Sequence, residues 1–172
     1  MSIDPTAQVH PTAIVEAGAV IGPDCRIGPY ACIGPDVVLG AGVVVKPHAV
    51  ITGWTEIGAA SVVFSFACVG EIPQDLKFAG ERSRLIIGAR CRIREGATLN
   101  TGTEGGGGIT RVGDDCLFMT GAHVGHDAQV GNRVIMANQS AVAGHCVIGD
   151  DVIIGGLSGV HQFVRIGRGA II

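Results

Sequence analysis

Four of the six histidines of this 172-residue chain fall in its last third, beside an aspartate and several glycines. They are His123, His126, His145 and His161, and Asp127 follows His126 directly. An imidazole changes charge near neutral pH and is also a common metal ligand. Titratable side chains gather at functional sites more often than elsewhere. The cluster is therefore the strongest candidate for a functional site in the sequence.

Three interpretations of this cluster compete. One histidine can act as a general base, with backbone N–H groups nearby to bind an oxyanion. Three neutral imidazoles can instead hold a zinc ion. In the third interpretation the histidines are surface residues that share a face and do no chemistry.

A period of six residues defines the elements that must position the cluster. Period six fits neither a helix, which repeats near 3.6, nor an ordinary strand, which alternates with period two. It is the hexapeptide signature of a parallel β-helix. Apolar residues occupy this six-residue grid in three runs: from Ile3 to Val69, from Ile87 to Leu99, and from Val112 to Ile172.

Three hexads make one triangular coil, so residues eighteen apart stack at the ordinary strand spacing of about 4.8 Å. By this rule Gly144 lies on His126, and His145 and His161 fall about one coil apart. His123 precedes His126 in the same turn. The repeat alone therefore gathers the four imidazoles on one flank.

Two further positions of the hexad have a consistent character. The residue after the grid position is often glycine, which we attribute to corner backbone angles that glycine adopts easily. The residue four positions after the grid is small and is expected to face the narrow interior. Four cysteines share this inward position, which predicts buried apolar thiols rather than disulfides or metal ligands: Cys25, Cys91, Cys116 and Cys146.

The repeat breaks at about residues 70–86 and 100–111, and loops that leave a rigid scaffold tend to carry function. The first break carries Gln74, Asp75 and Lys77, and we expect it to replace part of a coil. The second contains four successive glycines, at 105–108. We interpret it as a mobile connection, because no Lys-Ser/Thr pair follows as in a phosphate-binding loop.

Composition narrows the class of protein. The net charge of −3, without a basic cluster, argues against a nucleic-acid partner. No apolar stretch is long enough to cross a bilayer, and the first residues do not resemble a signal peptide. We therefore predict one cytoplasmic domain, residues 1–172, with no cofactor and no metal site.

Five segments carry a resemblance to a known family. They are HPTAIVEAGAVIG (10–22), IPQDLKFAGE (72–81), HVGHDAQVGN (123–132), AGHCVIGDD (143–151) and GLSGVHQF (156–163). In this order they resemble the bacterial acyl-[acyl-carrier-protein]–UDP-N-acetylglucosamine O-acyltransferases. The resemblance implies an all-β, left-handed parallel β-helix. It also implies transfer of a 3-hydroxyacyl chain to the sugar 3-hydroxyl, the first step of lipid A biosynthesis, directly in a ternary complex.

The resemblance also implies roles for single residues. His126 would be the general base, Asp127 would orient its ring, and the Gly144 N–H would bind the oxyanion. A related trimeric carbonic anhydrase holds zinc with an H-x4-H pair, and the H-x2-H spacing here argues against zinc. The nucleotide-sugar and acyl sites would be lined by Gln74, Asp75, Lys77, His123, His145, His161 and Gln162.

The family implies a homotrimer that takes acyl carrier protein and UDP-N-acetylglucosamine as partners. The acidic carrier protein calls for a basic docking patch, with candidates Arg82, Arg84, Arg90, Arg92, Arg94 and Arg111. The family continues past Ile172 with more coils and a helical domain, so we expect that part to be absent here. Two alternatives stay open: an N-acyltransferase acting on a related UDP-amino sugar, and a catalytically inactive structural trimer.

Overall fold

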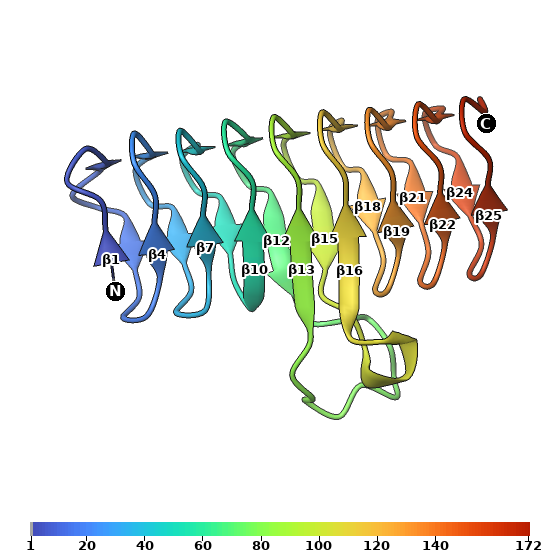
Figure 1. The fold of residues 1–172 in the computed structure, drawn as a ribbon, viewed down its shortest axis with the longest axis horizontal. Helices are drawn as coiled ribbons and strands as arrows, with labels where there is room; N and C mark the ends of the chain where they lie inside the picture. Colours follow the sequence, from blue (N-terminus) through green and yellow to red (C-terminus); the bar gives the residue numbers. More distant parts are fainter. Residues whose placement is uncertain (1) are drawn as a thin grey trace.

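The computed structural model describes residues 2–172, which wind into a three-sided parallel β-helix (Figure 1). In Figure 1 the chain rises along the front sheet, crosses the top and returns behind while it advances from left to right. That path is a left-handed coil, as predicted. One short 3₁₀ helix, η1 (Glu104–Gly106), is the helical element among the described residues.

Each face of the prism is one parallel sheet, and strands three apart in the chain are neighbours. The first sheet holds β1 (Ser2–Ile3), β4 (Val20–Ile21), β7 (Val38–Leu39), β10 (Trp54–Ile57), β13 (Arg84–Ile87), β16 (Ile109–Val112), β19 (Gln129–Val130), β22 (Val147–Ile148) and β25 (Arg165–Ile166). The second holds β2 (Gln8–Val9), β5 (Arg26–Ile27), β8 (Val44–Val45), β11 (Val62–Val63), β14 (Arg92–Ile93), β17 (Leu117–Phe118), β20 (Ile135–Met136) and β23 (Ile153–Ile154). The third holds β3 (Ile14–Val15), β6 (Cys32–Ile33), β9 (Val50–Ile51), β12 (Cys68–Glu71), β15 (Thr98–Asn100), β18 (His123–Val124), β21 (Ala141–Val142) and β24 (Gly159–Val160).

The grid residues fill the prism. Phe118 pairs with Met136 in adjacent coils, and both are fully buried. The four cysteines at the small inward position are also buried, which confirms that expectation. Grid residues at the two ends are more open, because a coil covers them on one side only. Ile3 is 37% exposed and Ile172 is 52% exposed.

The prediction that the corner glycines are required by their backbone angles is wrong. Apart from Gly70, which precedes the first loop, no glycine directly after a grid residue has a positive φ among the described residues. The left-handed residue lies two positions later and is usually not glycine, as at Asp115 and Asp127. The glycines are needed because the coils approach closely. A Cβ on Gly58, for example, would lie 2.5 Å from the Gly88 carbonyl carbon.

Both breaks in the repeat leave the third sheet and return to the first, so both loops lie at the same edge of the prism (Figure 1). Ile57 pairs with Ile87 and Ile87 with Val112, so the stacked residues are thirty and twenty-five positions apart instead of eighteen. The loops are thus inserted between complete coils and do not replace part of one. They span 72–83 and 101–108, less than predicted, because β12, β13 and β16 are longer than the other strands.

Two corners of the prism differ in what is attached to them. The loop corner links each strand of the third sheet to the first sheet, as at residues 125–128 and 143–146. The ladder corner links the first sheet to the second, as at residues 113–116 and 131–134. Within residues 2–172, no helix has the length and apolar character needed to span a membrane.

Candidate active site

His126 and Asp127 lie at the loop corner, directly after β18. Asp127 has a left-handed backbone, with φ of 58°. The His126 Nδ1 is 2.9 Å from Asp127 Oδ2. Both residues are buried, His126 to 6% exposure and Asp127 to 4%. The pair therefore forms a fixed dyad rather than two surface groups that share a face.

The second loop and the strand that follows it, β16, supply further contacts of Asp127. The Thr103 hydroxyl donates to Asp127 Oδ2 at 2.6 Å, and the Thr103 N–H donates to both carboxylate oxygens at 2.9 and 3.1 Å. The Asp127 N–H donates to Thr110 Oγ1 at 2.8 Å. A hydrogen bond to a charged group contributes roughly 1.5–3 kcal/mol. With Asp127 Oδ2 as the acceptor, the proton of the neutral imidazole lies on His126 Nδ1 and a lone pair is left on Nε2.

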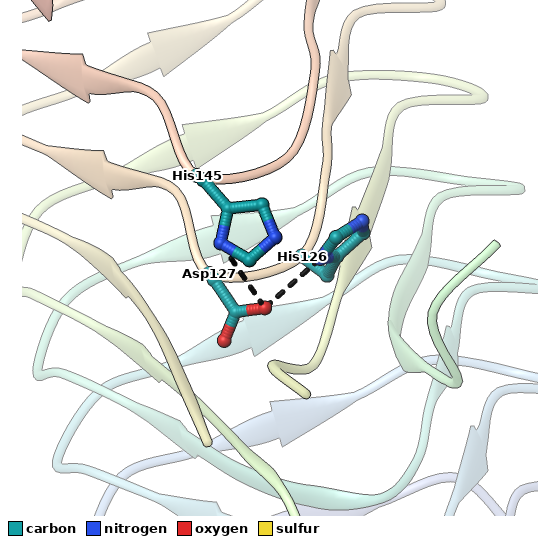
Figure 2. A group of neighbouring side chains, drawn as sticks. All are labelled: His126, Asp127 and His145. Carbon is teal, nitrogen blue, oxygen red and sulfur yellow. Dashed lines mark hydrogen bonds and ion pairs between the residues drawn. The ribbon is translucent and has the colours of Figure 1, made fainter. Parts of the chain in front are cut away.

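The next coil adds His145 and Gly144 to the dyad (Figure 2). The rings of His126 and His145 meet edge to face at 4.8 Å, and His145 Nδ1 is 3.8 Å from Asp127 Oδ2. On its other side His145 stacks flat on Phe163 at 4.6 Å. A Cβ on Gly144 would lie 2.5 Å from the His126 ring. Glycine at position 144 therefore makes room for the His126 ring.

The N–H of Gly144 is available to a ligand. Gly144 lies two positions after a grid residue, where the backbone N–H plays no part in the ladder of the sheets. Among the described residues, no acceptor takes a hydrogen bond from the Gly144 N–H. The same property explains why six prolines, which have no N–H, occupy equivalent positions in earlier coils: Pro5, Pro11, Pro23, Pro29, Pro35 and Pro47.

The first loop brings a carboxylate and an amine to this corner. Asp75 Oδ2 lies 4.0 Å from His126 Nε2. The Asp75 carboxylate also accepts a hydrogen bond from the backbone N–H of Lys77 at 2.9 Å. A hollow of about 380 Å³ opens beside them. Its walls combine both loops with the next coil, and include Asp75, Lys77, Phe78, Thr103, His145 and Phe163.

Other predicted site residues lie apart from the dyad. Gln74, His161 and Gln162 are exposed, and Gln162 follows Gly144 in the stack of coils. His123 lies on the outer side of the third sheet, where its Nδ1 is 2.8 Å from Thr98 Oγ1. Burial, together with the nearby His126 imidazole, lowers the pKa of His123 below its ordinary value of 6.5. A neutral His123 is thus the form expected at pH 7.

The six arginines considered for docking do not form one patch. Arg84 pairs with Glu56, Arg90 with Asp115 and Arg94 with Glu95. Arg82 lies over the Trp54 ring, 3.3 Å from its centroid. These contacts come from different faces and corners of the prism, so the arginines give no single docking surface within this part of the chain.

The ligand atoms of His126, Asp127 and His145 lie within 4.8 Å of one another, close enough to hold a metal ion. The arrangement of their hydrogen bonds fits acid–base chemistry better. Asp127 Oδ2 already accepts the Thr103 hydroxyl and faces His126 Nδ1. A metal ion would have to displace both. The Nε2 of His126, by contrast, is free to take a proton.

Sequence reasoning missed three residues that shape this site: Thr103, Thr110 and Phe163. Phe163 had a usable signal, because it lies eighteen positions after His145. Thr110 begins no motif, and it reaches Asp127 only because β16 pairs with β19. Thr103 comes from an insertion whose path no period describes.

The three-sided coil and its corner dyad define a class, the hexapeptide-repeat transferases. The family described as bacterial transferase hexapeptide (six repeats) matches residues 18–53. Similar proteins narrow the class further. The acyl-[acyl-carrier-protein]–UDP-N-acetylglucosamine O-acyltransferase of Paracoccus denitrificans (strain Pd 1222) is 74% identical over 111 residues, which cover 64% of this chain and 42% of that protein.

Two solved structures agree. UDP-N-acetylglucosamine acyltransferase from Campylobacter jejuni is 44% identical, with a TM-score of 0.92 over 95% of this chain and 64% of its own. The UDP-N-acetylglucosamine O-acyltransferase (LpxA) from Moraxella catarrhalis RH4 is 42% identical, with a TM-score of 0.62 over 100% of this chain and 67% of its own. The chain belongs to the UDP-N-acetylglucosamine O-acyltransferase family, as predicted. It spans less than half the length of the P. denitrificans relative.

Proposed function

We propose that the whole protein moves a 3-hydroxyacyl chain from acyl carrier protein to the 3-hydroxyl of UDP-N-acetylglucosamine, the first step of lipid A biosynthesis. The observation that carries the proposal is the buried His126–Asp127 dyad, with Nδ1 and Oδ2 2.9 Å apart, in a chain of this family. The P. denitrificans relative is named for this acyl donor and acceptor.

In this mechanism His126 Nε2 removes the proton from the sugar hydroxyl as its oxygen attacks the thioester carbonyl. Asp127 keeps the proton on Nδ1, and its negative charge stabilises the imidazolium that forms. Collapse of the tetrahedral intermediate expels the carrier thiol, which takes the proton back from Nε2. Direct transfer in a ternary complex needs no acyl-enzyme. Consistent with this, Ser140 is fully buried and donates to the Ala137 carbonyl at 2.8 Å.

The developing oxyanion needs a donor that is preorganised and otherwise unused. We assign this role to the Gly144 N–H. Its support is the close approach of Gly144 to the His126 ring and the lack of an acceptor for this N–H among residues 2–172.

The hollow beside the dyad is the proposed sugar-nucleotide site. Asp75, 4.0 Å from His126 Nε2, would accept a sugar hydroxyl, and the Lys77 ammonium would face the diphosphate. His145 also lines the hollow. Gln74, His123, His161 and Gln162 would complete the binding surfaces, with Gln162 above Gly144 in the stack.

We further propose a cytoplasmic homotrimer that packs through flat faces of the prism. Apolar side chains that point outward support this assembly, among them Ile14 at 57% and Val50 at 36% exposure on the third sheet. His123 points outward on the same sheet. A neighbouring subunit on this face would therefore border the site.

The test is acyl transfer by the whole protein, with purified 3-hydroxyacyl-acyl carrier protein and UDP-N-acetylglucosamine. We expect transfer by the unmodified protein and by His10→Ala, because the imidazole of His10 is exposed and, among the described residues, bonds to Thr12 nearby. His126→Ala is expected to lose at least about a thousandfold in kcat.

Two results would replace the proposal. Transfer to the 3-amino sugar but not to the 3-hydroxyl sugar would support the N-acyltransferase alternative. No transfer to either acceptor by a folded trimer would support the structural trimer.

A further inference from the structure

The glycine loop, residues 101–108, is built around the Asp127 carboxylate. A Cβ on Gly106 would lie 2.0 Å from Asp127 Cγ, and one on Gly102 would lie 2.7 Å from Asp127 Oδ1. No side chain larger than hydrogen fits at either position without moving the carboxylate. The glycines therefore allow the loop to close on Asp127.

The loop is also bonded to itself, contrary to the mobile connection inferred from its glycines. The Gly106 and Gly108 N–H groups donate to the Thr103 carbonyl at 3.1 and 2.7 Å. Gly107 and Gly108 have φ of 93° and 76°, values that favour glycine. This turn fixes Thr103, which is 6% exposed, with its N–H and hydroxyl toward the carboxylate.

We propose that Thr103 is a positioning residue for the proton-transfer step, acting through Asp127. Its two donors fix the direction in which Asp127 Oδ2 faces His126 Nδ1. The glycine loop thereby sets which imidazole nitrogen carries the proton and which is free. The catalytic part of this inference rests on the proposed function, whereas the effect on the dyad does not.

The first test measures the hydrogen bond between His126 and Asp127 in the absence of substrate. An Nδ1–H proton that is buried and hydrogen-bonded to a carboxylate exchanges slowly and gives a proton NMR resonance downfield of the amides. We expect one such resonance in the whole protein, assigned by its loss in His126→Asn. It is expected to persist in Thr103→Ser, which keeps the hydroxyl, and to move upfield or vanish in Thr103→Val.

Two glycine variants make a matched pair for the same measurement. Gly106→Ala places a methyl against the carboxylate, whereas Gly105→Ala adds the same methyl where no atom lies within 4 Å. The resonance is expected to change in Gly106→Ala and to stay in Gly105→Ala. A resonance unchanged in both Thr103→Val and Gly106→Ala overturns the proposal, whatever the activity of the protein.

The second test asks whether the effect reaches catalysis. For acyl transfer, Thr103→Val is expected to lower kcat about ten- to a hundredfold with KM within about twofold, and Thr103→Ser to restore it. Thr55→Val is the control for loss of a buried threonine hydroxyl, because Thr55 bonds to the Thr52 carbonyl far from the dyad. An equal loss of kcat in Thr55→Val, or a change in KM alone, overturns the catalytic part.

Discussion

Asp115 and Asp127 occupy equivalent positions at two corners of the same coil region, yet their surroundings differ completely. Both follow a grid valine by three positions, in VGDDC (112–116) and VGHDA (124–128), and both have φ near 60°. Asp115 is open, with 41% of its side chain exposed, and pairs with the Arg90 guanidinium. Asp127 has 1% of its side chain exposed and faces His126.

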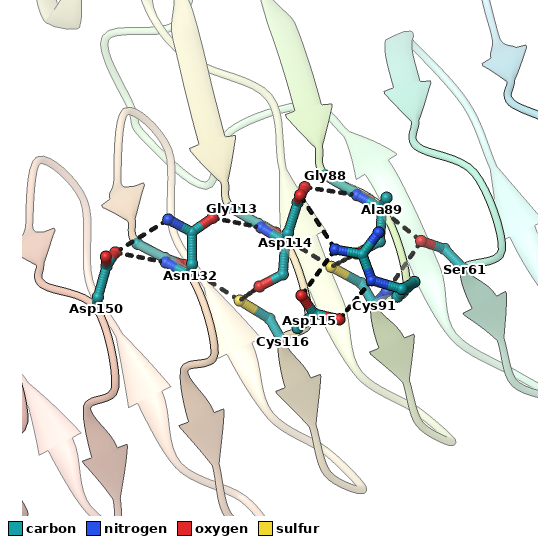
Figure 3. Close-up of polar contacts among 12 residues, drawn as sticks. Ser61, Gly88, Ala89, Cys91, Gly113, Asp114, Asp115, Cys116, Asn132 and Asp150 are labelled. Carbon is teal, nitrogen blue, oxygen red and sulfur yellow. Dashed lines mark hydrogen bonds and ion pairs between the residues drawn. The ribbon is translucent and has the colours of Figure 1, made fainter.

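The backbone N–H groups at these corners differ in the same way. At the ladder corner each side chain caps the coil before it: Asp114 N–H donates to Asn132 Oδ1, and Asn132 N–H donates to Asp150 Oδ1, both at 2.8 Å (Figure 3). At the loop corner the equivalent residue after His126 is Gly144, which has no side chain. Position 144 therefore offers no side-chain cap to the N–H of His126, and the Gly144 N–H itself has no acceptor among the described residues.

A corner of the hexapeptide coil therefore has no function by itself; its surroundings decide what it can do. At the ladder corner, side chains of successive coils stack along the prism and are joined by hydrogen bonds. Two insertions that cover a corner exclude water from it and supply neutral donors to a carboxylate. The covered corner can then hold an oriented histidine, which an open corner cannot.

The largest expected difference between the corners comes from neutralising each aspartate. Asp127→Asn is expected to lower kcat for acyl transfer about 10³- to 10⁴-fold, because His126 loses the charge that fixes its tautomer. Asp115→Asn is expected to leave kcat within about twofold. Steady-state kinetics on the whole protein measure both, and equal losses would show that the corners are not functionally distinct.

A methyl group at Gly144 tests how tightly the loop corner is packed. Gly144→Ala places Cβ 2.5 Å from the His126 ring, so the ring must move, with an expected loss of about a hundredfold in kcat. Gly159→Ala is the matched variant, because its Cβ meets nothing within 4 Å. If Gly144→Ala kept full activity, the His126 position described here would not be the catalytic one.

His123 makes the stability of the fold depend on pH. Burial lowers its pKa, so the unfolded chain binds a proton below pH 6.5 while the folded chain does not. Stability is therefore lost as the pH falls through 6.5. Thermal unfolding at pH 7.5 to 5.0 is expected to show a smaller decline in His123→Gln than in the unmodified protein. Parallel declines would contradict a half-buried, neutral His123.

The smallest effect is expected at the ladder corner. The Arg133 guanidinium lowers the pKa of Asp151 below its ordinary value of 3.8, so their attraction stabilises the fold above that pH and is lost below it. Arg133→Gln should lower Tm by no more than about 2 °C at pH 7, because Arg133 is exposed and Asp151 is only half-buried. The difference should vanish near pH 3 and shrink in salt. A deficit that persists in acid would indicate lost packing instead.

Much of the site followed from arithmetic on the sequence. The six-residue period predicted the coil, its stacked columns and the meeting of His126 with position 144, because parallel strands in register bring equivalent residues together. The same logic predicted the buried cysteines. The sequence-based explanation of the corner glycines was wrong. Glycine is required at these positions because neighbouring coils approach closely, not because of the backbone angles.

The two loops show where sequence reasoning ends. Their positions were visible as breaks in the period, but nothing in the residues showed that both return to one corner or that Thr103 reaches Asp127. An insertion has no period, and its path is fixed by what it packs against. The sequence by itself determined the scaffold and which side chains stack, since a repeat carries its own geometry. Only the tertiary structure decided which corner is covered, because burial and hydrogen bonding of Asp127 arise from contacts between distant segments.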